Sequence, residues 1–262
     1  MTALIIACHP DDMELMMAGT ALLLKDKGCT LHCMTVANGS AGSTELGPKE
    51  IAALRREESM KSAGLLGAVF HESLVDDLEV FYTSNLIRII TGLVRNVKPD
   101  IVLTQSLEDY MEDHMNTARI AVAGTFQRGM PNYRSIPDLP AVFGDTMLYH
   151  ATPHILTDMM RKPVVPELYV DVTPVMERKE KMLACHASQK EWLDRTQGFD
   201  SYLATMRTLT ETVGGLSGRF RFAEGWRRHA HVGFTRQDCN PLTDILGASC
   251  VGNPAWSAGQ TV

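Results

Sequence analysis

The sequence predicts an α/β protein with a mostly parallel sheet that is covered by helices on both faces. Leu4–Ala7 is an apolar run too short for a buried helix and typical of a strand that is buried on both sides. An apolar helical stretch follows at Met13–Leu24, and Thr30–Ala37 then alternates as a second strand. A strand, a helix and a strand in this order indicate a βαβ unit, whose two strands lie parallel.

Further strands and helices alternate along the chain. Pro48 begins a helix that Gly67 ends, and Pro99 separates the next helix from the fourth strand. Beyond the βαβ unit, strands are expected at Ala68–Leu74, Asp100–Ser106, Met147–His150 and Leu168–Val172, and helices at Pro48–Leu66, Ser84–Val97, Asn116–Arg128, Thr173–Trp192 and Phe199–Thr212. We therefore expect one α/β domain with a C-terminal α/β elaboration over residues 1–236. Residues 237–262 are expected to be a tail that is loosely ordered or contacts another subunit.

Two loops are candidates for binding a substrate. Asn38–Gly47 is rich in Gly and Ser, and it follows the second strand at the edge of the sheet where the first strand also ends. Gly129–Pro140 is rich in proline and is expected to fold over the site. The first strand-to-helix turn lacks the Gly-x-Gly-x-x-Gly pattern of dinucleotide-binding proteins, so a dinucleotide cofactor is not expected.

The composition argues against several classes of partner. The formal charge is −6 and no basic stripe is visible, so neither nucleic acid nor an anionic membrane surface is expected to bind. No stretch reaches the ~18 apolar residues of a membrane span, and the opening apolar run is too short for a signal peptide. A cytoplasmic location is expected. The six cysteines are spread over the chain and do not form the pattern of a disulfide framework.

Residue types that bind metals follow two strands of the predicted sheet. His9 and Asp12 come directly after the first strand, and His114 comes after the strand at Asp100–Ser106. Because parallel strands end at the same edge of a sheet, these side chains are expected to lie close together. A catalytic zinc site uses three ligands of the His, Asp and Glu class and leaves a position for water. His9, Asp12 and His114 supply such a set, which Fe²⁺ or Co²⁺ would also accept.

Asp11 is the candidate general base. Two consecutive carboxylates cannot easily point the same way, so Asp12 can bind the metal while Asp11 faces the water that the metal activates. This division predicts a hydrolase.

These residues carry a resemblance to a known family. Ala7-Cys8-His9-Pro10-Asp11-Asp12, together with Asp113-His114, resembles the LmbE-like, PIG-L de-N-acetylase superfamily. The resemblance continues through Leu54–Glu58, Asp171–Gln189 and Glu224–Trp226, and it covers about residues 4–230.

The resemblance implies a Rossmann-like α/β fold and a zinc-dependent amidase, typically one that removes acetyl from N-acetylglucosamine-containing molecules. It implies His9, Asp12 and His114 as zinc ligands, Asp11 as the base, and an arginine near Arg55 as a substrate contact. Asn38, in the glycine-rich loop, is a further candidate for contacting the substrate. A small-molecule amide, such as an amino sugar, would be the substrate, and a homo-oligomer would be compatible with the family.

One position departs from the family's pattern. The family usually has His-x-Asp-His where this chain has Met111-Glu112-Asp113-His114. The first histidine donates to the oxyanion of the tetrahedral intermediate and the Asp holds that imidazole, so Asp113 matches an orienting carboxylate with no imidazole to orient. Methionine cannot donate a hydrogen bond, and losing one oxyanion donor raises a barrier by about 3–4 kcal/mol. Tyr110 and His150 are the candidate replacements.

Two alternatives stay open at this point. The first is a hydrolase of a non-sugar amide or cyclic imide in a catabolic pathway, which the missing histidine and the apolar neighbourhood of Met111 and Met115 favour. The second is a metal-binding protein that recognises a small ligand with little catalysis. A catalytic role is favoured because Asp11 has no structural need to stand beside a complete ligand set.

Overall fold

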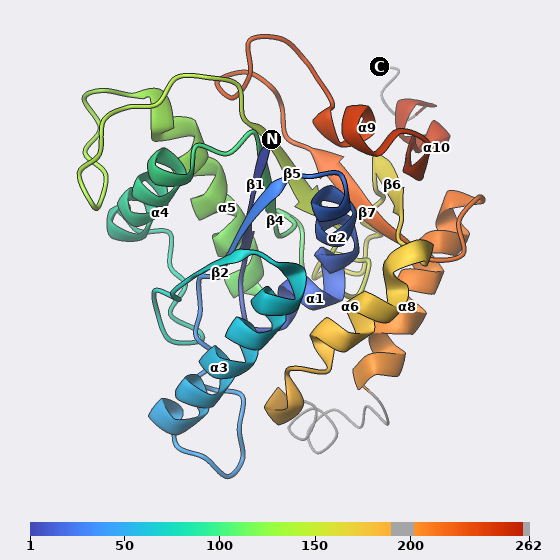
Figure 1. Cartoon of the computed structure of the whole chain (residues 1–262), viewed down its shortest axis with the longest axis horizontal. Helices are drawn as coiled ribbons and strands as arrows, with labels where there is room; N and C mark the ends of the chain where they lie inside the picture. Colours follow the sequence, from blue (N-terminus) through green and yellow to red (C-terminus); the bar gives the residue numbers. More distant parts are fainter. Residues whose placement is uncertain (190–201, 259–262) are drawn as a thin grey trace.

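The computed structural model describes residues 1–189 and 202–258, and these residues form one eight-stranded sheet with helices on both faces (Figure 1). The strand order is β3-β2-β1-β4-β5-β7-β6-β8. The strands are β1 (Thr2–Ala7), β2 (Thr30–Thr35), β3 (Val69–His71), β4 (Ile101–Thr104), β5 (Met147–Ala151), β6 (Leu168–Asp171), β7 (Ala223–Arg228) and β8 (Cys250–Gly252). The run from β3 to β5 is parallel, whereas β7 and β8 are antiparallel to their neighbours. The predicted mostly parallel α/β sheet is confirmed.

The helices lie in two layers. They are α1 (Asp12–Met16), α2 (Ala18–Asp26), α3 (Pro48–Leu66), α4 (Ser84–Val97), α5 (Glu112–Phe126), α6 (Met176–Leu183), α8 (Tyr202–Ser217), α9 (Pro241–Leu246) and α10 (Pro254–Ala258), with 3-10 turns at Gln127–Gly129, Thr173–Val175 and Gly247–Ser249. Figure 1 shows α4 and α5 on one side of the sheet, and α2, α3, α6 and α8 on the other. No helix in the described part of the chain is long and apolar enough to span a bilayer.

Strand β1 is apolar throughout because both of its faces are covered. Leu4 and Ile6 belong to the core beneath α4 and α5, whereas Ala3 and Ile5 belong to the core on the opposite face. Side chains of a strand alternate between its two faces, so a central strand needs apolar residues at every position.

Helices α3 and α4 have the bounds that the sequence predicts. Gly67 ends α3 in a left-handed conformation with φ 68°, and the Thr83 side chain accepts a hydrogen bond from the Leu86 amide at the start of α4. Both ends are decided by residues next to the helix, which is why the sequence predicts them well.

The predicted helix Met13–Leu24 is wrong as a single element, because it breaks at Met17 into α1 and α2. The cause lies far along the chain. The Glu224 carboxylate on β7 accepts hydrogen bonds of 2.8 Å from the amides of both Gly19 and Thr20. These amides stand at the N-terminus of α2, where helix N–H groups have no partner of their own. The Lys179 ammonium lies 2.6 Å from the same carboxylate and neutralises it.

Helix α5 begins at Glu112, four residues earlier than the predicted start at Asn116. The predicted helix begins after the acidic residues Glu112 and Asp113, but carboxylates are favourable in the first turn of a helix. The earlier start places Asp113 and His114 on that first turn, so the helix rather than a loop fixes their direction.

The prediction that Gly129–Pro140 folds over the site is wrong. The buried Arg95 guanidinium donates hydrogen bonds to the carbonyls of Leu139 and Met130 at 2.7 and 2.8 Å. Arg95 lies near the C-terminal end of α4, beside the start of β4. The loop is therefore held at the edge where the parallel strands begin, opposite the edge that carries His9.

The C-terminal region is more ordered than the sequence predicts. The expectation of a loosely ordered tail is wrong for residues 237–258, because β8 pairs with β6 and Leu242, Leu246 and Cys250 are buried in the core. Strand β7 was not predicted, since its sequence Ala-Glu-Gly-Trp-Arg-Arg has no regular apolar alternation. The predicted helix Thr173–Trp192 instead begins as a 3-10 turn and is followed by α6, which ends at Leu183. Its last residues, and the predicted helix start at Phe199, lie outside the described residues.

Candidate metal centre

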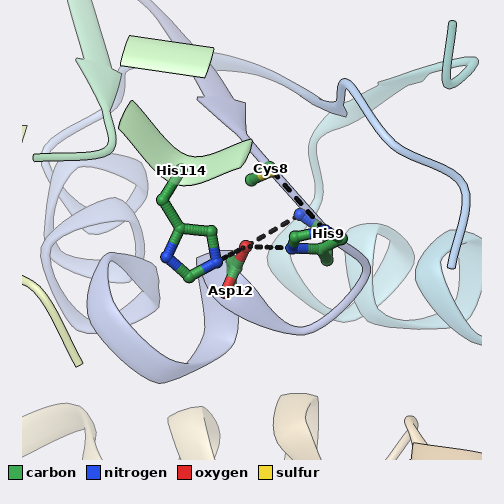
Figure 2. Close-up of side chains that lie close together, drawn as sticks. All are labelled: Cys8, His9, Asp12 and His114. Atoms are coloured by element: carbon green, nitrogen blue, oxygen red, sulfur yellow. Dashed lines mark hydrogen bonds and ion pairs between the residues drawn. The ribbon is translucent and has the colours of Figure 1, made fainter. Parts of the chain in front are cut away.

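The structure brings the three predicted metal ligands together. His9 follows β1, Asp12 begins α1, and His114 stands in the first turn of α5, directly after the neighbouring strand β4. All three side chains are buried, and Figure 2 shows His9 and His114 directed at Asp12 from either side. The convergence follows from two parallel strands ending at one edge of the sheet.

The distances from Asp12 to the two imidazoles fit a tetrahedral metal ion. Asp12 Oδ2 lies 3.3 Å from His9 Nδ1 and 3.3 Å from His114 Nε2. Ligands held at about 2.0–2.1 Å around a tetrahedral zinc ion stand about 3.3 Å from one another. Asp12 and each imidazole are therefore spaced as two ligands of such an ion, and all the possible ligand atoms lie within 4.8 Å of one another.

Cys8 is the fourth member of this cluster, whose possible ligand atoms all lie within 4.8 Å of one another. Its sulfur lies 3.7 Å from His9 Nε2, the ring nitrogen that does not face Asp12. Cys8 is also packed in the apolar core beneath α4 and α5. We therefore assign it no metal bond.

A carboxylate stands behind each imidazole. Asp113 Oδ2 lies 3.2 Å from His9 Nε2 and also accepts a 2.8 Å hydrogen bond from the Leu78 amide. Asp109 Oδ1 lies 3.1 Å from His114 Nδ1. Carboxylates in this position fix the ring tautomer and its orientation, so the opposite nitrogens face the metal position.

This arrangement corrects one sequence-based interpretation and adds one residue. Asp113 was matched to a carboxylate that orients an imidazole at position 111, but the imidazole that it contacts is that of His9. Asp109 was not singled out by the sequence analysis. Its signal was its place among the ionisable residues after β4.

The two imidazoles lie in a negative environment. Burial by itself lowers the pKa of His114, but Asp12 and Asp109 outweigh burial and hold that pKa above its usual value. Burial likewise favours a raised pKa for Asp12, and the His114 and His9 rings hold it well below its usual range instead. A divalent cation would be attracted by the same negative field, and its binding would displace protons from the imidazoles.

Asp11 points to different partners from those of Asp12. Its backbone has a φ of 106°, which is rare for a residue with a side chain. Asp11 Oδ2 accepts hydrogen bonds from Arg55 Nη2 at 3.3 Å and from the Tyr202 hydroxyl. Burial raises the pKa of Asp11 to about 6, although the Arg55 charge opposes that shift. A carboxylate with such a pKa can exchange a proton near neutral pH.

Arg55 is buried and donates a hydrogen bond to Asp11, the candidate base. Its side chain is only 2% exposed, and its guanidinium donates to the Pro10 carbonyl as well as to Asp11. The loop Asn38–Gly47 packs against the Arg55 side chain at Gly39, where a Cβ atom would come within 2.5 Å of Arg55 Cδ. The structure therefore places Arg55 against the base, and not on an open surface.

Of the other predicted substrate contacts, Tyr110 lies nearest the metal position. Its ring meets the His114 ring edge-on with centroids 5.7 Å apart, and 44% of the residue is exposed. Met111 immediately precedes α5 and is half-buried. Asn38 donates to Asp76 and lines, with Pro10, a cavity of about 220 Å³.

His150, a candidate donor to the substrate, is buried and has partners within the protein for both of its ring nitrogens. Its Nδ1 lies 2.8 Å from the Gln105 carbonyl oxygen, and its Nε2 lies 3.0 Å from His229 Nδ1. A carbonyl only accepts, so Nδ1 carries the proton, and both ring nitrogens are engaged within the protein. His150 has no N–H group left to donate.

His154 is a histidine that the sequence analysis missed. It follows β5, at the same edge of the sheet as the metal ligands. Burial lowers its pKa, with the charges of Asp12, His114 and Asp109 also acting on it. The available signal was its position three residues after a strand that neighbours β4.

The fold and the cluster define a Rossmann-like α/β protein with a buried group of His, Asp and His side chains that could hold a metal ion. The family model PIG-L, described as GlcNAc-PI de-N-acetylase, matches residues 4–124. Diacetylchitobiose deacetylase of Thermococcus kodakarensis is 31% identical over 230 residues, which cover 86% of this chain and 81% of that protein. The chain belongs to the PIG-L, or LmbE-like, family.

Other relatives extend the comparison. A 4-oxalmesaconate hydratase of Pseudomonas putida is 23% identical over 197 residues, which cover 72% of this chain and 74% of that protein. The structure of N,N'-diacetylchitobiose deacetylase from Pyrococcus horikoshii has a TM-score of 0.73 at 26% identity, over 92% of this chain and 88% of that one. A 4-carboxy-2-hydroxymuconate hydratase structure from Pseudomonas putida, at 22% identity and a TM-score of 0.71, covers 91% of this chain and 98% of that one and shares the fold.

Proposed function

We propose that the protein is a metal-dependent amidohydrolase that removes the acetyl group from an N-acetylated amino sugar or its conjugate. The observation that carries the proposal is the pair of carboxylates after β1. Asp12 stands 3.3 Å from both ligand imidazoles, whereas Asp11 makes none of these contacts and binds Arg55. The sugar substrate rests on the 31% identity to a diacetylchitobiose deacetylase.

In this proposal His9, Asp12 and His114 hold the ion, and Asp113 and Asp109 keep the two imidazoles in place. When bound, a divalent metal would lower the pKa of a water molecule toward neutrality and polarise the amide carbonyl. Zinc suits the donor set, and Fe²⁺ or Co²⁺ would suit it as well.

Asp11 moves the proton. As the general base it takes a proton from the attacking water, and it then gives that proton to the nitrogen of the leaving amine. Its pKa of about 6 suits both steps near neutral pH.

The donor to the carbonyl oxygen differs from the family's usual histidine. Met111 cannot donate and His150 has no free N–H group. Tyr110 and His154 are the donors that we propose for this edge of the sheet. Burial, with the negative charges of Asp12 and Asp109, raises the pKa of Tyr110, so its hydroxyl keeps its proton.

The cellular setting is also part of the proposal. We assign a cytoplasmic location, because all six cysteines lie in described residues and are free thiols, as is usual in a reducing compartment. The substrate would be a small molecule, and a homo-oligomer remains compatible with the family.

A second candidate is the addition of water to, or hydrolysis of, a non-sugar compound. Two observations favour it: Met111 replaces the expected histidine, and a hydratase is among the curated relatives. The same Asp11 would then serve as the base toward a different carbonyl compound.

The test combines metal analysis with product release. Purified protein should contain about one metal ion per chain and should release acetate from N,N'-diacetylchitobiose or N-acetylglucosamine, and Asp11→Asn should abolish release while keeping the metal. Asp26→Asn is the matched control, because Asp26 is a surface partner of Arg178. Metal without acetate release, but with turnover of non-sugar amides or of unsaturated acids, would favour the second candidate. Metal without turnover on any of these would favour a binding protein.

A further inference from the structure

Helix α8 brings a buried phenol to the candidate base from 191 residues away in the sequence. Tyr202 is the first residue of α8 and is only 3% exposed. Its ring belongs to the apolar core on the face of α2 and α6, while its hydroxyl donates to Asp11 Oδ2. Neither the residue nor the contact follows from the motif around His9.

The two donors on Asp11 share one oxygen. Arg55 Nη2 also donates to Asp11 Oδ2, at 3.3 Å, and the same guanidinium binds the neighbouring Pro10 carbonyl. Among the described residues, none donates to Asp11 Oδ1. Within the described part of the chain, one oxygen of the carboxylate therefore has two protein donors and the other has none.

The orientation of the Asp11 carboxylate depends on hydrogen bonds from other residues. Its φ of 106° is a sparsely populated conformation for a residue with a Cβ atom, and the carboxylate of Asp12 follows directly and carries the same charge. The backbone strain favours another conformation of the turn, and the charge of Asp12 favours rotation of the Asp11 carboxylate away from it. Hydrogen bonds to a carboxylate are among the stronger ones and depend on direction.

We infer that Tyr202 is a positioning residue for catalysis, which holds Asp11 so that Oδ1 faces the water to be deprotonated. This inference rests on the proposed role of Asp11 as the general base. Arg55 supplies charge and one direction, and Tyr202 supplies the second direction, so the carboxylate plane is defined by two donors. Because the Tyr202 hydroxyl contacts Asp11 and is not part of the Cys8, His9, Asp12 and His114 cluster, its loss should slow the reaction without weakening the binding of metal or substrate.

The test is Tyr202→Phe, which removes one oxygen atom and keeps the ring in the core. Tyr149→Phe is the matched control, because Tyr149 is also fully buried and its hydroxyl donates to Asn240 at 2.9 Å, away from the candidate metal centre. Tyr202→Phe loses one buried hydrogen bond, whereas Tyr149→Phe loses two, because the Tyr149 hydroxyl also accepts from the Leu242 amide at 3.2 Å. The control is therefore at least as disruptive to packing as the test variant. The kinetic measurements are kcat and KM for N,N'-diacetylchitobiose. Metal binding is followed by the Co²⁺ affinity and by the absorption spectrum of the Co²⁺-substituted protein. Stability is followed by the melting temperature.

Tyr202→Phe should lower kcat about 10- to 100-fold, because a misplaced catalytic group costs about that factor. KM and the Co²⁺ affinity should stay within twofold of wild type. The Co²⁺ absorption spectrum should be unchanged. Tyr149→Phe should keep the wild-type kcat at an equal or larger loss of melting temperature.

Three results would overturn the inference. The first is a kcat for Tyr202→Phe within threefold of wild type while the wild type turns over, which would leave the proposed function standing. The second is an equal loss of kcat in Tyr149→Phe, which would make the effect one of general stability. The third is an altered Co²⁺ spectrum, which would place the effect on the metal ligands. If the wild-type, metal-loaded protein releases no acetate, the proposed function falls and the inference falls with it.

Discussion

Replacing Gly39 by alanine should separate the arginine from the candidate base. Gly39 has a φ of +82°, and a Cβ atom there would stand 2.5 Å from Arg55 Cδ and 2.7 Å from Nε. Arg55 cannot swing into solvent easily, because it is 2% exposed and its guanidinium is bound to both Pro10 and Asp11. The new methyl group and the bound guanidinium therefore compete for the same space.

Two costs follow from this substitution. A Cβ at positive φ costs roughly 1–2 kcal/mol of stability. Displacing Arg55 also removes a hydrogen bond to a charged group, worth about 1.5–3 kcal/mol. If that bond orients Asp11 for proton transfer, kcat/KM should fall about 10- to 100-fold.

Gly28→Ala is the matched control. Gly28 has a similar φ of +84°, but a Cβ there would meet nothing within 4 Å. Acetate release and urea unfolding should be measured for both variants. We expect Gly28→Ala to lose about 1–2 kcal/mol of stability and no activity, whereas Gly39→Ala should lose more stability and most activity. Activity of Gly39→Ala within threefold of Gly28→Ala would refute the role assigned to Arg55.

Further outcomes can be measured on the same protein. Met111→His should raise acetate release at least tenfold, since a working oxyanion donor is worth at least ~1.4 kcal/mol; a smaller gain would show that position 111 does not face the carbonyl oxygen. Burial lowers the pKa of His150 to about 4, below that of an unfolded histidine, so the contribution of His150 to the free energy of unfolding should be constant above about pH 7 and should decrease by about 2.5 kcal/mol as the pH falls to 4.5. Urea unfolding at pH 7 and pH 4.5 measures this loss, and an equal loss in His150→Asn would assign it to other groups. Lys179→Met should lower the free energy of unfolding by about 3–5 kcal/mol, because it leaves the buried Glu224 charge without its 2.6 Å partner, and a double variant that adds Glu224→Gln should recover part of the loss. Chelation should lower the melting temperature and Zn²⁺ or Co²⁺ should restore it, because an ion that binds only the folded state stabilises that state; an unchanged melting temperature would argue against the metal site.

The parts that could be predicted from the sequence are those that neighbouring residues decide. The apolar run of β1 identifies a central strand, and glycine and threonine set the ends of α3 and α4. The positions of His9, Asp12 and His114 follow from the same reasoning, because each stands at the end of a strand and parallel strands share an edge.

Some features were missed because their causes are distant in the chain. The break at Met17 depends on Glu224, which stands on the unpredicted strand β7. The loop at Gly129–Pro140 is held by hydrogen bonds from the Arg95 guanidinium to the carbonyls of Leu139 and Met130, and a pattern of apolar residues does not predict such bonds. Residues 237–258 gain order from pairing with β6, although their composition is typical of a loop.

The features of the candidate site also fall into those that the sequence predicts and those that depend on tertiary packing. The sequence by itself determined the ligand types, the separate carboxylate Asp11 and the edge of the sheet on which they meet. Only the tertiary structure decided which groups orient them: Asp113 and Asp109 behind the imidazoles, and Arg55 and Tyr202 on Asp11. The physical reason is that strand and helix periodicity depends on residues a few positions apart, whereas a directional hydrogen bond between distant segments forms only after packing has brought them together.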